Sequence, residues 1–381
     1  MKFTILKDEL NDSIQQVSRA LSNRTTIPIL TGIKLDADEK GVTLTASDTE
    51  ISIRSFIPAE EDGTVTVSLE QPGSAVVPGK LFSELIRKLP SEHVEFTLLD
   101  SHHVLIRSGS AELQMAGLDP EEYPLLPSLR EDRMFTIPSD LLKSMIRETI
   151  FAVSTNESTP ILTGVLWTLS DGVLKFVATD RHRLSMTENR LEGAEGLSFS
   201  QVVISGRNLS ELYKLLPDQS QLIDVVVSDS QVLFKIDRLL FYTRILDGTY
   251  PDISRIIPQS CQTEMVVPTG RFHDAMDRAY LLSREEKTNI VRLSASGGSG
   301  VVEITSTLTE LGRMTEQIEA ESVTGEEVRI AFNSRYMLDA LKSIGSEYVQ
   351  VGFTGPMSPI LVHPREHRRL LHLILPYRTS G

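Results

Sequence analysis

The sequence contains almost no cysteine and no long apolar run. Its 381 residues include one cysteine, Cys261, and one tryptophan. A single cysteine excludes an intramolecular disulfide framework and any zinc site built on several cysteines. We interpret Cys261 as a thiol without a special role, because a cytosolic setting keeps thiols reduced. No apolar stretch is long enough for a signal peptide or a membrane span, which favours a cytoplasmic protein.

Positive charge is also scarce. The chain has 38 lysines and arginines against 52 aspartates and glutamates, which gives a formal net charge of −14. General nucleic-acid binders usually present basic surfaces, so the total argues against that class unless the cations gather on one part of the surface. The remaining composition, 40% hydrophobic and 24% charged, is that of a globular protein with ample core material.

Groups that could carry catalysis are few. The best candidates are Asp180 and His182, but they lack a partner Ser or Cys motif and a second acidic cluster. Gly297–Gly300 lacks the Lys-Ser/Thr of a phosphate loop and lies between strand-like runs, which indicates a hairpin turn. We therefore predict a binding or scaffold protein with no catalytic residue, no metal and no cofactor. An enzyme centred on Asp180 and His182 stays open as an alternative.

What the chain does contain is a repeat. Pro28–Gly32 reads Pro-Ile-Leu-Thr-Gly, and Pro160–Gly164 repeats it 132 positions later (160 − 28). A third, degenerate copy leads into Asn289–Leu293. The spacing is too long for a solenoid unit, which repeats every ~20–50 residues, but it suits a domain of ~100–150 residues. The sequence predicts a triplication.

Two proline-rich linkers, Leu118–Pro127 and Leu246–Pro258, separate the copies. They place three domains at 1–128, 129–258 and 259–381. Within the first domain, a strand near Lys2–Ile5 and a helix over Asp8–Leu21 are followed by alternating strand patterns, and a second helix over Leu81–Leu89 repeats the plan. The fold class is therefore α+β, with each domain a doubled strand–helix–strands unit.

The second helix of each domain carries two cations seven residues apart, which lie on one helix face. Another face carries the apolar stripe that we expect to be buried, for example Leu81, Leu85 and Leu89 in the first domain. Surface helices often carry lysine and arginine without a function, but recurrence in register favours a basic face on an acidic protein. The cations are Lys80 and Arg87, Arg207 and Lys214, and Arg335 and Lys342.

These features together resemble a known family. The repeated Pro-Ile-Leu-Thr-Gly is joined by Thr179-Asp180-x-His182-Arg183-Leu184, by Asp247-Gly248-x-Tyr250-Pro251-Asp252 and by a terminal Leu375–Arg378. Over the whole chain, the sequence resembles the bacterial DNA polymerase III beta subunit, a sliding clamp. The two central motifs are specific in combination, although neither would suffice alone.

The resemblance implies three tandem domains of the DNA-clamp fold that close as a head-to-tail homodimer into a six-domain ring. Helices would line the hole around duplex DNA, held without sequence preference, and sheets would form the outer wall. The family is a non-catalytic processivity factor that tethers the replicative polymerase, the clamp loader and other proteins with a clamp-binding motif. A monomeric scaffold that binds peptides without encircling DNA is the second alternative.

Three sets of residues match the family's functional positions. The partner-peptide pocket between the second and third domains would comprise Leu162, Thr179, His182, Arg183, Leu184, Pro251, Arg255, Ile256, Tyr336, Met357, Leu373, Leu375, Tyr377 and Arg378. The DNA-binding set would add Arg24 and Asn156 to the six helix cations. The dimer interface would pair Leu85, Leu89, Leu113 and Met115 of one chain with Leu281 and Leu282 of the other.

Two positions depart from the family pattern. Arg181 stands where many members have a small residue, and Thr379–Gly381 extends past the usual ending. Both departures concern access to the predicted pocket.

Overall fold

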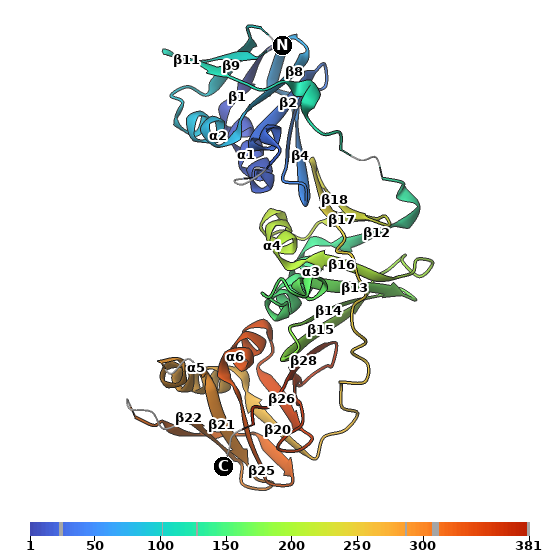
Figure 1. Ribbon diagram of the computed structural model, residues 1–381, viewed down its shortest axis with the longest axis vertical. Coiled ribbons are helices and arrows are strands. Elements are labelled where there is room, and N and C mark those ends of the chain that lie inside the picture. Colours follow the sequence, from blue (N-terminus) through green and yellow to red (C-terminus); the bar gives the residue numbers. More distant parts are fainter. Residues whose placement is uncertain (23–25, 101, 127–128, 286–287, 307–311, 379–381) are drawn as a thin grey trace. The chain divides into compact units, whose positions relative to one another are not determined.

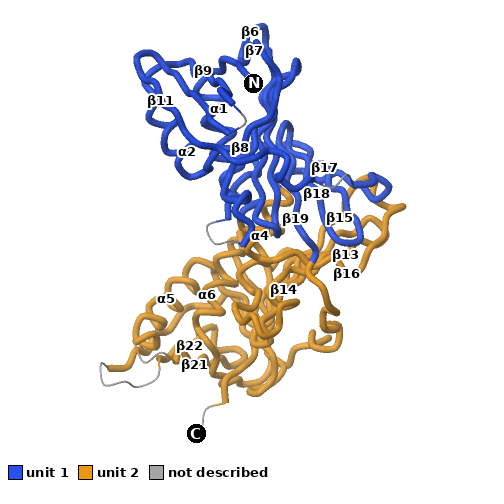
Figure 2. The backbone as a smooth tube through the Cα atoms, turned by 45° about the horizontal axis from the view of Figure 1, so that its top comes forward, with its two compact units in different colours: residues 1–140, 211–245 blue, residues 141–210, 246–381 orange. Residues whose placement is uncertain are grey.

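The computed structural model describes residues 1–22, 26–100, 102–126, 129–285, 288–306 and 312–378 (Figure 1). The chain divides into two compact units (Figure 2). Unit 1 combines Met1–Asp140 with Glu211–Ile245, and unit 2 combines Leu141–Ser210 with Leu246–Gly381.

The helices form where the sequence places apolar residues at helical spacing. Their bounds are α1 (Lys7–Val17), α2 (Gly79–Lys88), α3 (Ser139–Thr149), α4 (Gly206–Leu215), α5 (Thr269–Glu285) and α6 (Ser334–Ser343). The first helix is shorter than predicted, because the chain tightens into a 3-10 turn over Ser18–Ala20 before Leu21.

The stripe predicted for α2 is wrong. Phe82 and Ile86 are the buried apolar residues of this helix, whereas Leu81 is exposed and Leu85 is half-buried. The helix carries two apolar rows, and the row with Phe82 and Ile86 is the one that packs inward. The ring of Phe82 contacts that of Phe96 edge to face, with ring centroids 6.4 Å apart. The corresponding stripes at α4 and α6 are buried as predicted. They consist of Leu209, Leu212 and Leu216 in the second domain and of Met337, Leu341 and Ile344 in the third.

Each third of the chain exchanges strands in the same way. The strand before the first helix joins the second three-stranded meander, and the strand before the second helix joins the first meander. In the first third, β1 (Lys2–Leu6) joins β9 (His93–Leu98), β10 (His103–Ser108) and β11 (Ala111–Ala116), and β8 (Gly73–Pro78) joins β2 (Gly32–Asp38), β3 (Gly41–Ser47) and β4 (Ile51–Pro58).

The other two thirds repeat this exchange, which confirms the predicted triplication. In the middle third, β12 (Met134–Pro138) joins β17 (Leu222–Val227), β18 (Gln231–Ile236) and β19 (Leu239–Arg244), and β16 (Phe199–Ser205) joins β13 (Gly164–Ser170), β14 (Val173–Thr179) and β15 (Arg183–Arg190). In the last third, β20 (Thr263–Pro268) joins β26 (Tyr348–Phe353), β27 (Ile360–Pro364) and β28 (Leu370–Ile374), and β25 (Val328–Asn333) joins β21 (Ile290–Ala295), β22 (Val301–Ser306) and β23 (Thr315–Glu319).

Four short strands complete the sheets. They are β7 (Val67–Gln71) beside β1, β24 (Ser322–Gly325) beside β20, and the hairpin of β5 (Glu60–Glu61) and β6 (Thr64–Val65). Gly297–Gly300 connects the antiparallel pair β21 and β22, so the predicted hairpin turn is confirmed.

The repeated Pro-Ile-Leu-Thr-Gly has one structural role in both copies. Each forms a 3-10 turn, over Pro28–Thr31 and Pro160–Thr163, whose closing glycine starts a strand. A Cβ on Gly32 would lie 2.5 Å from the side chain of Val76, and a Cβ on Gly164 would lie 2.6 Å from that of Val203. Both distances are too short for a real contact, so the turn can press this closely on the sheet only with glycine.

Two sheets run on from one third of the chain into the next. In unit 1, β4 pairs with β19, and in unit 2, β15 pairs with β28. We call these two antiparallel pairings joint 1 and joint 2. A buried tyrosine of each linker fastens the linker beside its joint. The Tyr250 hydroxyl accepts a hydrogen bond from the backbone N–H of Thr179 at 3.1 Å, and the Tyr123 hydroxyl donates to the carbonyl oxygen of Thr45 at 3.3 Å. Burial raises the pKa of both phenols.

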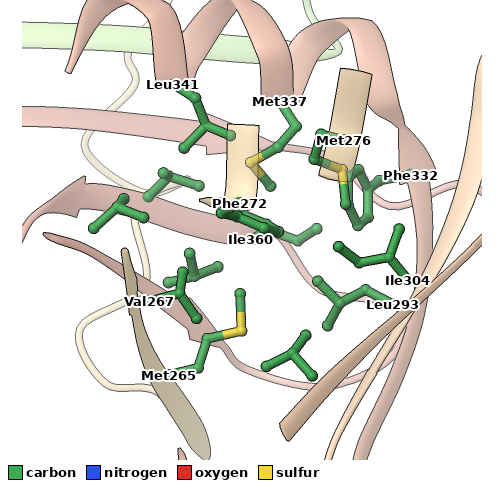
Figure 3. Close-up of a cluster of buried hydrophobic side chains, with 14 of the residues drawn as sticks. Met265, Val267, Phe272, Met276, Leu293, Ile304, Phe332, Met337, Leu341 and Ile360 are labelled. Carbon is green, nitrogen blue, oxygen red and sulfur yellow. The ribbon is translucent and has the colours of Figure 1, made fainter. Parts of the chain in front are cut away.

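The last third of the chain buries a layer of side chains between its helices and sheets. In the last third, α5 and α6 lie side by side on the strands (Figure 1). Phe272 and Met276 of α5 and Met337 of α6 pack on Met265 of β20 and Phe332 of β25 (Figure 3). Adaptable methionine side chains fill the space around the two aromatic rings.

The core of joint 2 contains a histidine. His372 of β28 is buried, lies opposite Ser185 of β15, and packs on Phe151 with ring centroids 5.6 Å apart. Its Nε2 lies 2.9 Å from the Ser343 hydroxyl, which donates to the carbonyl oxygen of Ala340 and therefore accepts from the ring. Complete burial lowers the pKa of His372 to about 3, since a charged ring would lose its hydration there.

This buried ring makes unit 2 sensitive to acid. The pKa of an unfolded histidine is about 6.5, so between pH 6.5 and about 3 the unfolded chain binds a proton that the folded chain does not. Stability is therefore full above pH 6.5 and falls as the pH drops. We predict a loss of about 2 kcal/mol in the free energy of unfolding between pH 7 and pH 5, measured by urea titration.

The substitution His372→Gln keeps an N–H for Ser343 but removes the titrating ring, so it should flatten this pH dependence. His102→Gln, at an exposed position, is the matched control and should leave the slope unchanged. An equal slope in His372→Gln and the unsubstituted protein would contradict the assignment.

Candidate functional site

The residues predicted to form a pocket all lie in unit 2, around joint 2. Leu162, Leu184 and Leu373 are buried in one apolar cluster with Tyr250. Thr179 is also buried, and Tyr336 is half-buried on α6. These residues form the packed base of the region. We call the full predicted set of fourteen residues the candidate peptide site.

The other apolar members of the set are exposed. Ile256 is 45% exposed, Met357 51%, Leu375 36% and Tyr377 55%. Among the described residues of unit 2, five large hydrophobic side chains are exposed, and these are four of them; the fifth is Leu281. Exposed apolar side chains that gather on one surface are typical of binding sites, whereas scattered ones are not informative.

The chain end is held at this surface by backbone hydrogen bonds. The N–H of Leu375 donates to the carbonyl oxygen of His182 at 2.9 Å, and the N–H of Tyr377 donates to that of Ala331 at 2.7 Å. Leu375 thus continues the strand pairing of joint 2, whereas Pro376 and Tyr377 pair with β25. The extension Thr379–Gly381 lies outside the described residues.

Arg183 is the most heavily bonded side chain in the region. Its guanidinium donates to Asp180 at 3.0 Å, to Asp339 at 2.7 Å and to the carbonyl oxygen of Phe151 at 2.5 Å. It also lies 4.5 Å from the ring centroid of Tyr336, within cation–π distance. With 13% of its side chain exposed, Arg183 joins β15 to α6 and is largely satisfied by the protein itself. The resemblance had placed Arg183 in the partner-peptide pocket, and the sequence gave no signal for Asp339 or Phe151 as its partners.

Asp180 and His182 do not form a catalytic pair. One oxygen of the Asp180 carboxylate accepts the backbone N–H groups of His182 and Arg183 at 2.9 and 3.0 Å, and the other accepts Nε of Arg183. The His182 ring is exposed and makes no hydrogen bond in the part of the chain that the structure describes. The carboxylate is therefore a turn-forming group rather than a general base.

The last three members of the site are exposed. Pro251, Arg255 and Arg378 lie at the surface. Neither arginine has an ion pair or hydrogen bond with another described residue, although the pKa of the Asp252 carboxyl is lowered by hydrogen bonds from Ser254 and, less strongly, by the charge of Arg255.

The six helix cations predicted to face DNA are all exposed. Two have partners on their own helices: Lys214 pairs with Glu211 at 2.7 Å, and Arg335 pairs with Asp339 at 3.2 Å. Asn156 is exposed and accepts the N–H of Ser158 in the turn before Pro160. Arg24 lies outside the described residues.

The residues predicted for the dimer interface differ in burial. Leu281 is exposed at the end of α5, whereas Leu85, Leu89, Leu113 and Leu282 are half-buried. Met115 is already buried within its own unit, which leaves it little surface to contribute. The strands β11 and β23 each form the edge of a sheet. Beside β23, a hollow of about 450 Å³ is lined by Arg271, Asp274, Arg278, Glu316, Gln317, Ile318 and Glu319.

In the described ranges, no group of three or more His, Cys, Asp or Glu side chains is arranged to hold a metal ion. None of the helices there is both long and apolar enough to cross a membrane.

Three family models match successive parts of the chain. They are the N-terminal, central and C-terminal domains of the DNA polymerase III beta subunit, at residues 1–127, 136–252 and 254–378. Among curated proteins, the chain is 48% identical over 379 residues to the beta sliding clamp of Bacillus subtilis and 46% identical over 380 residues to that of Halalkalibacterium halodurans, with full coverage of both chains in each case.

Solved structures agree with these matches. The crystal structure of the Bacillus subtilis DNA polymerase sliding clamp superposes with a TM-score of 0.97, covering all of both chains at 48% identity. The beta chain of DNA polymerase III from Streptococcus pneumoniae gives a TM-score of 0.94 at 34% identity, covering 99% of this chain and all of that one. The chain therefore belongs to the DNA polymerase III beta subunit family, the beta sliding clamps, and its function is that of the non-catalytic processivity factor of DNA polymerase III.

Proposed function

We propose that the candidate peptide site captures the replicative polymerase, the clamp loader and other partners of this clamp. The observation that carries the proposal is that four of the five exposed large hydrophobic side chains described in unit 2, Ile256, Met357, Leu375 and Tyr377, belong to the predicted site, which also contains the buried Leu162, Leu184 and Leu373. Exposed anchors on a preformed surface suit a short extended peptide with apolar and aromatic side chains near its end. Met357 and Leu375 are unbranched at Cβ and can repack around such an anchor.

We further propose that two chains close head to tail into a ring around duplex DNA, with domains ending near residues 128 and 258, in the cytoplasm. Two features support the closure. The edges of β11 and β23 offer unpaired backbone groups that a second chain can extend. Leu281 supplies an exposed apolar side chain near the charged hollow beside β23.

Joint 1 supports the choice of joint 2 as the peptide site. It has the same strand pairing, but Arg244 occupies the place of Leu375. The backbone N–H of Arg244 donates to the carbonyl oxygen of Glu50, just as the backbone N–H of Leu375 donates to the carbonyl oxygen of His182. An apolar anchor in one copy is thus a cation in the other. At this position the apolar side chain is found in joint 2 and not in joint 1.

The first test truncates two of the anchors. Met357→Ala with Leu375→Ala should remove contact area worth about 1–3 kcal/mol for each side chain, which is at least a tenfold loss of affinity. Calorimetry with a synthetic peptide carrying apolar and aromatic residues near its end measures the loss. Leu222→Ala, an exposed leucine outside the site, is the control. If the double variant bound the peptide with an affinity within threefold of that of the unsubstituted protein, the proposed location of the site would be wrong.

The second test concerns assembly. Leu281→Ala with Leu282→Ala should give a folded monomer of half the native mass in light scattering, because the pair supplies apolar surface at the end of α5. Leu99→Ala, another exposed leucine, should leave the mass unchanged. A double variant with the native mass would refute this interface.

The third test concerns the helix cations. Changing Arg207, Lys214, Arg335 and Lys342 to Glu should weaken retention on nicked circular DNA, since phosphate contacts need positive charge. Peptide binding should not change. The matched control also changes four cations to Glu, but at positions on strands and turns: Lys175, Lys235, Arg329 and Arg365. Equal retention of both variants across a salt series would mean that the helix cations do not meet DNA.

A further inference from the structure

One long side chain occupies a strained backbone position beside the candidate peptide site. Six described residues other than glycine have positive φ, and four of these are aspartate or asparagine, which tolerate the left-handed region. The other two are Thr49, with φ of 79°, and Arg181, with φ of 76°. They occupy the same place in the two copies of one turn, 132 positions apart.

The two turns have the same hydrogen bonds. Asp48 accepts the N–H groups of residues 50 and 51, as Asp180 accepts those of residues 182 and 183. The N–H of Thr49 donates to the Ser47 hydroxyl at 3.3 Å, and the N–H of Arg181 donates to the Thr179 hydroxyl at 3.2 Å. Since threonine makes the turn equally well, the conformation does not require an arginine at position 181.

The Arg181 side chain is only lightly held. One guanidinium nitrogen donates to the Thr159 hydroxyl at 3.2 Å, and the rest of the group is exposed. No carboxylate in the described parts of the chain pairs with it, because the neighbouring Asp180 is engaged by Arg183. The contact places the guanidinium beside Pro160–Thr163, the turn that carries Leu162 of the site.

Three exposed arginines lie on segments that carry the candidate peptide site: Arg181, Arg255 and Arg378. The charge of Arg255 interacts with that of the nearby Asp252 carboxyl, whereas Arg181 and Arg378 have no carboxylate partner among the described residues. The first copy of the turn has no arginine at the place of Arg181, since Thr49 and Glu50 stand where Arg181 and His182 stand in the second. A cation at this position of the turn is therefore found in the second copy and not in the first.

We propose that Arg181 is a specificity-determining residue, which favours partner peptides that carry an aspartate or glutamate side chain next to their apolar anchors. This inference rests on the proposed peptide site and names the chemistry of its ligand. An exposed ion pair is worth little, so the preference is two- to fivefold at low salt. It disappears at high salt, where exposed charges are screened.

The test uses pairs of synthetic peptides with the same apolar anchors. Within each pair, one of the three residues before the anchors is Asp in one peptide and Asn in the other. We expect the unsubstituted protein to bind one or more Asp peptides two- to fivefold more tightly than the Asn partner at low salt. Arg181→Thr should lose this preference while binding the Asn peptides as before, and its turn should fold because threonine is the residue of the first copy. Thr49→Arg should change nothing, and Arg181→Lys should keep part of the preference.

The outcomes separate the two proposals. Equal binding of every Asp and Asn pair by the unsubstituted protein would overturn the role of Arg181 while leaving the peptide site in place. A preference that persists in Arg181→Thr would assign it to Arg255 or Arg378 instead, which also overturns the role of Arg181. Failure of all the peptides to bind would overturn the peptide site itself.

Discussion

The ion pairs of Arg183 are the constraint on which the functional surface depends. A guanidinium that is 13% exposed needs partners for its charge, and it finds Asp180, Asp339 and the carbonyl oxygen of Phe151. These partners come from a turn, a helix and a 3-10 segment far apart in the sequence. Arg183 therefore fixes α6 and the Asp180 turn against β15, and with them Tyr336 and the end of β28. In the proposed peptide site, Arg183 therefore positions other residues, whereas Arg181 and Arg378 have no carboxylate partner among the described residues.

The chain contains its own comparison of what a clamp joint requires and what a binding site adds. Joints 1 and 2 share the strand pairing, the linker tyrosine, the glycine-closed 3-10 turn and the aspartate turn. These shared features hold the fold. The differences are at exposed positions, where joint 2 has Leu375 and Arg181 and joint 1 has Arg244 and Thr49 at the corresponding places. The proposed peptide site thus differs from joint 1 in exposed side chains, while the hydrogen bonds and strand pairing of the two joints correspond.

The sequence predicted the features that depend on neighbouring residues and that recur along the chain. The triplication, the α+β class, the first strands and the buried stripes of α4 and α6 are visible because periodicity and spacing are properties of neighbouring residues. The stripe of α2 was misjudged because the helix carries two apolar rows, and only the packing of Phe82 on Phe96 decides between them. The sequence did not predict the partners of Arg183 for a different reason. Asp339 lies 156 residues away from Arg183 in the chain, and no local pattern connects the two. The burial of Met115 likewise depends on tertiary packing that the alternating strand pattern does not specify.

The ion pairs of the helix cations limit how strongly these cations can bind phosphate. Lys214 and Arg335 already have carboxylate partners on their own helices. A phosphate must compete with these partners, so each contact would be weak and quickly exchanged. Within the proposed ring this is an advantage, because encirclement holds the DNA while weak contacts allow movement along it. Exposed cations with internal partners are also screened further by salt. The acidic remainder of the chain repels phosphate from other surfaces. Modest attraction on the helices and repulsion elsewhere is the charge distribution expected of a protein that must stay on DNA without staying at one place.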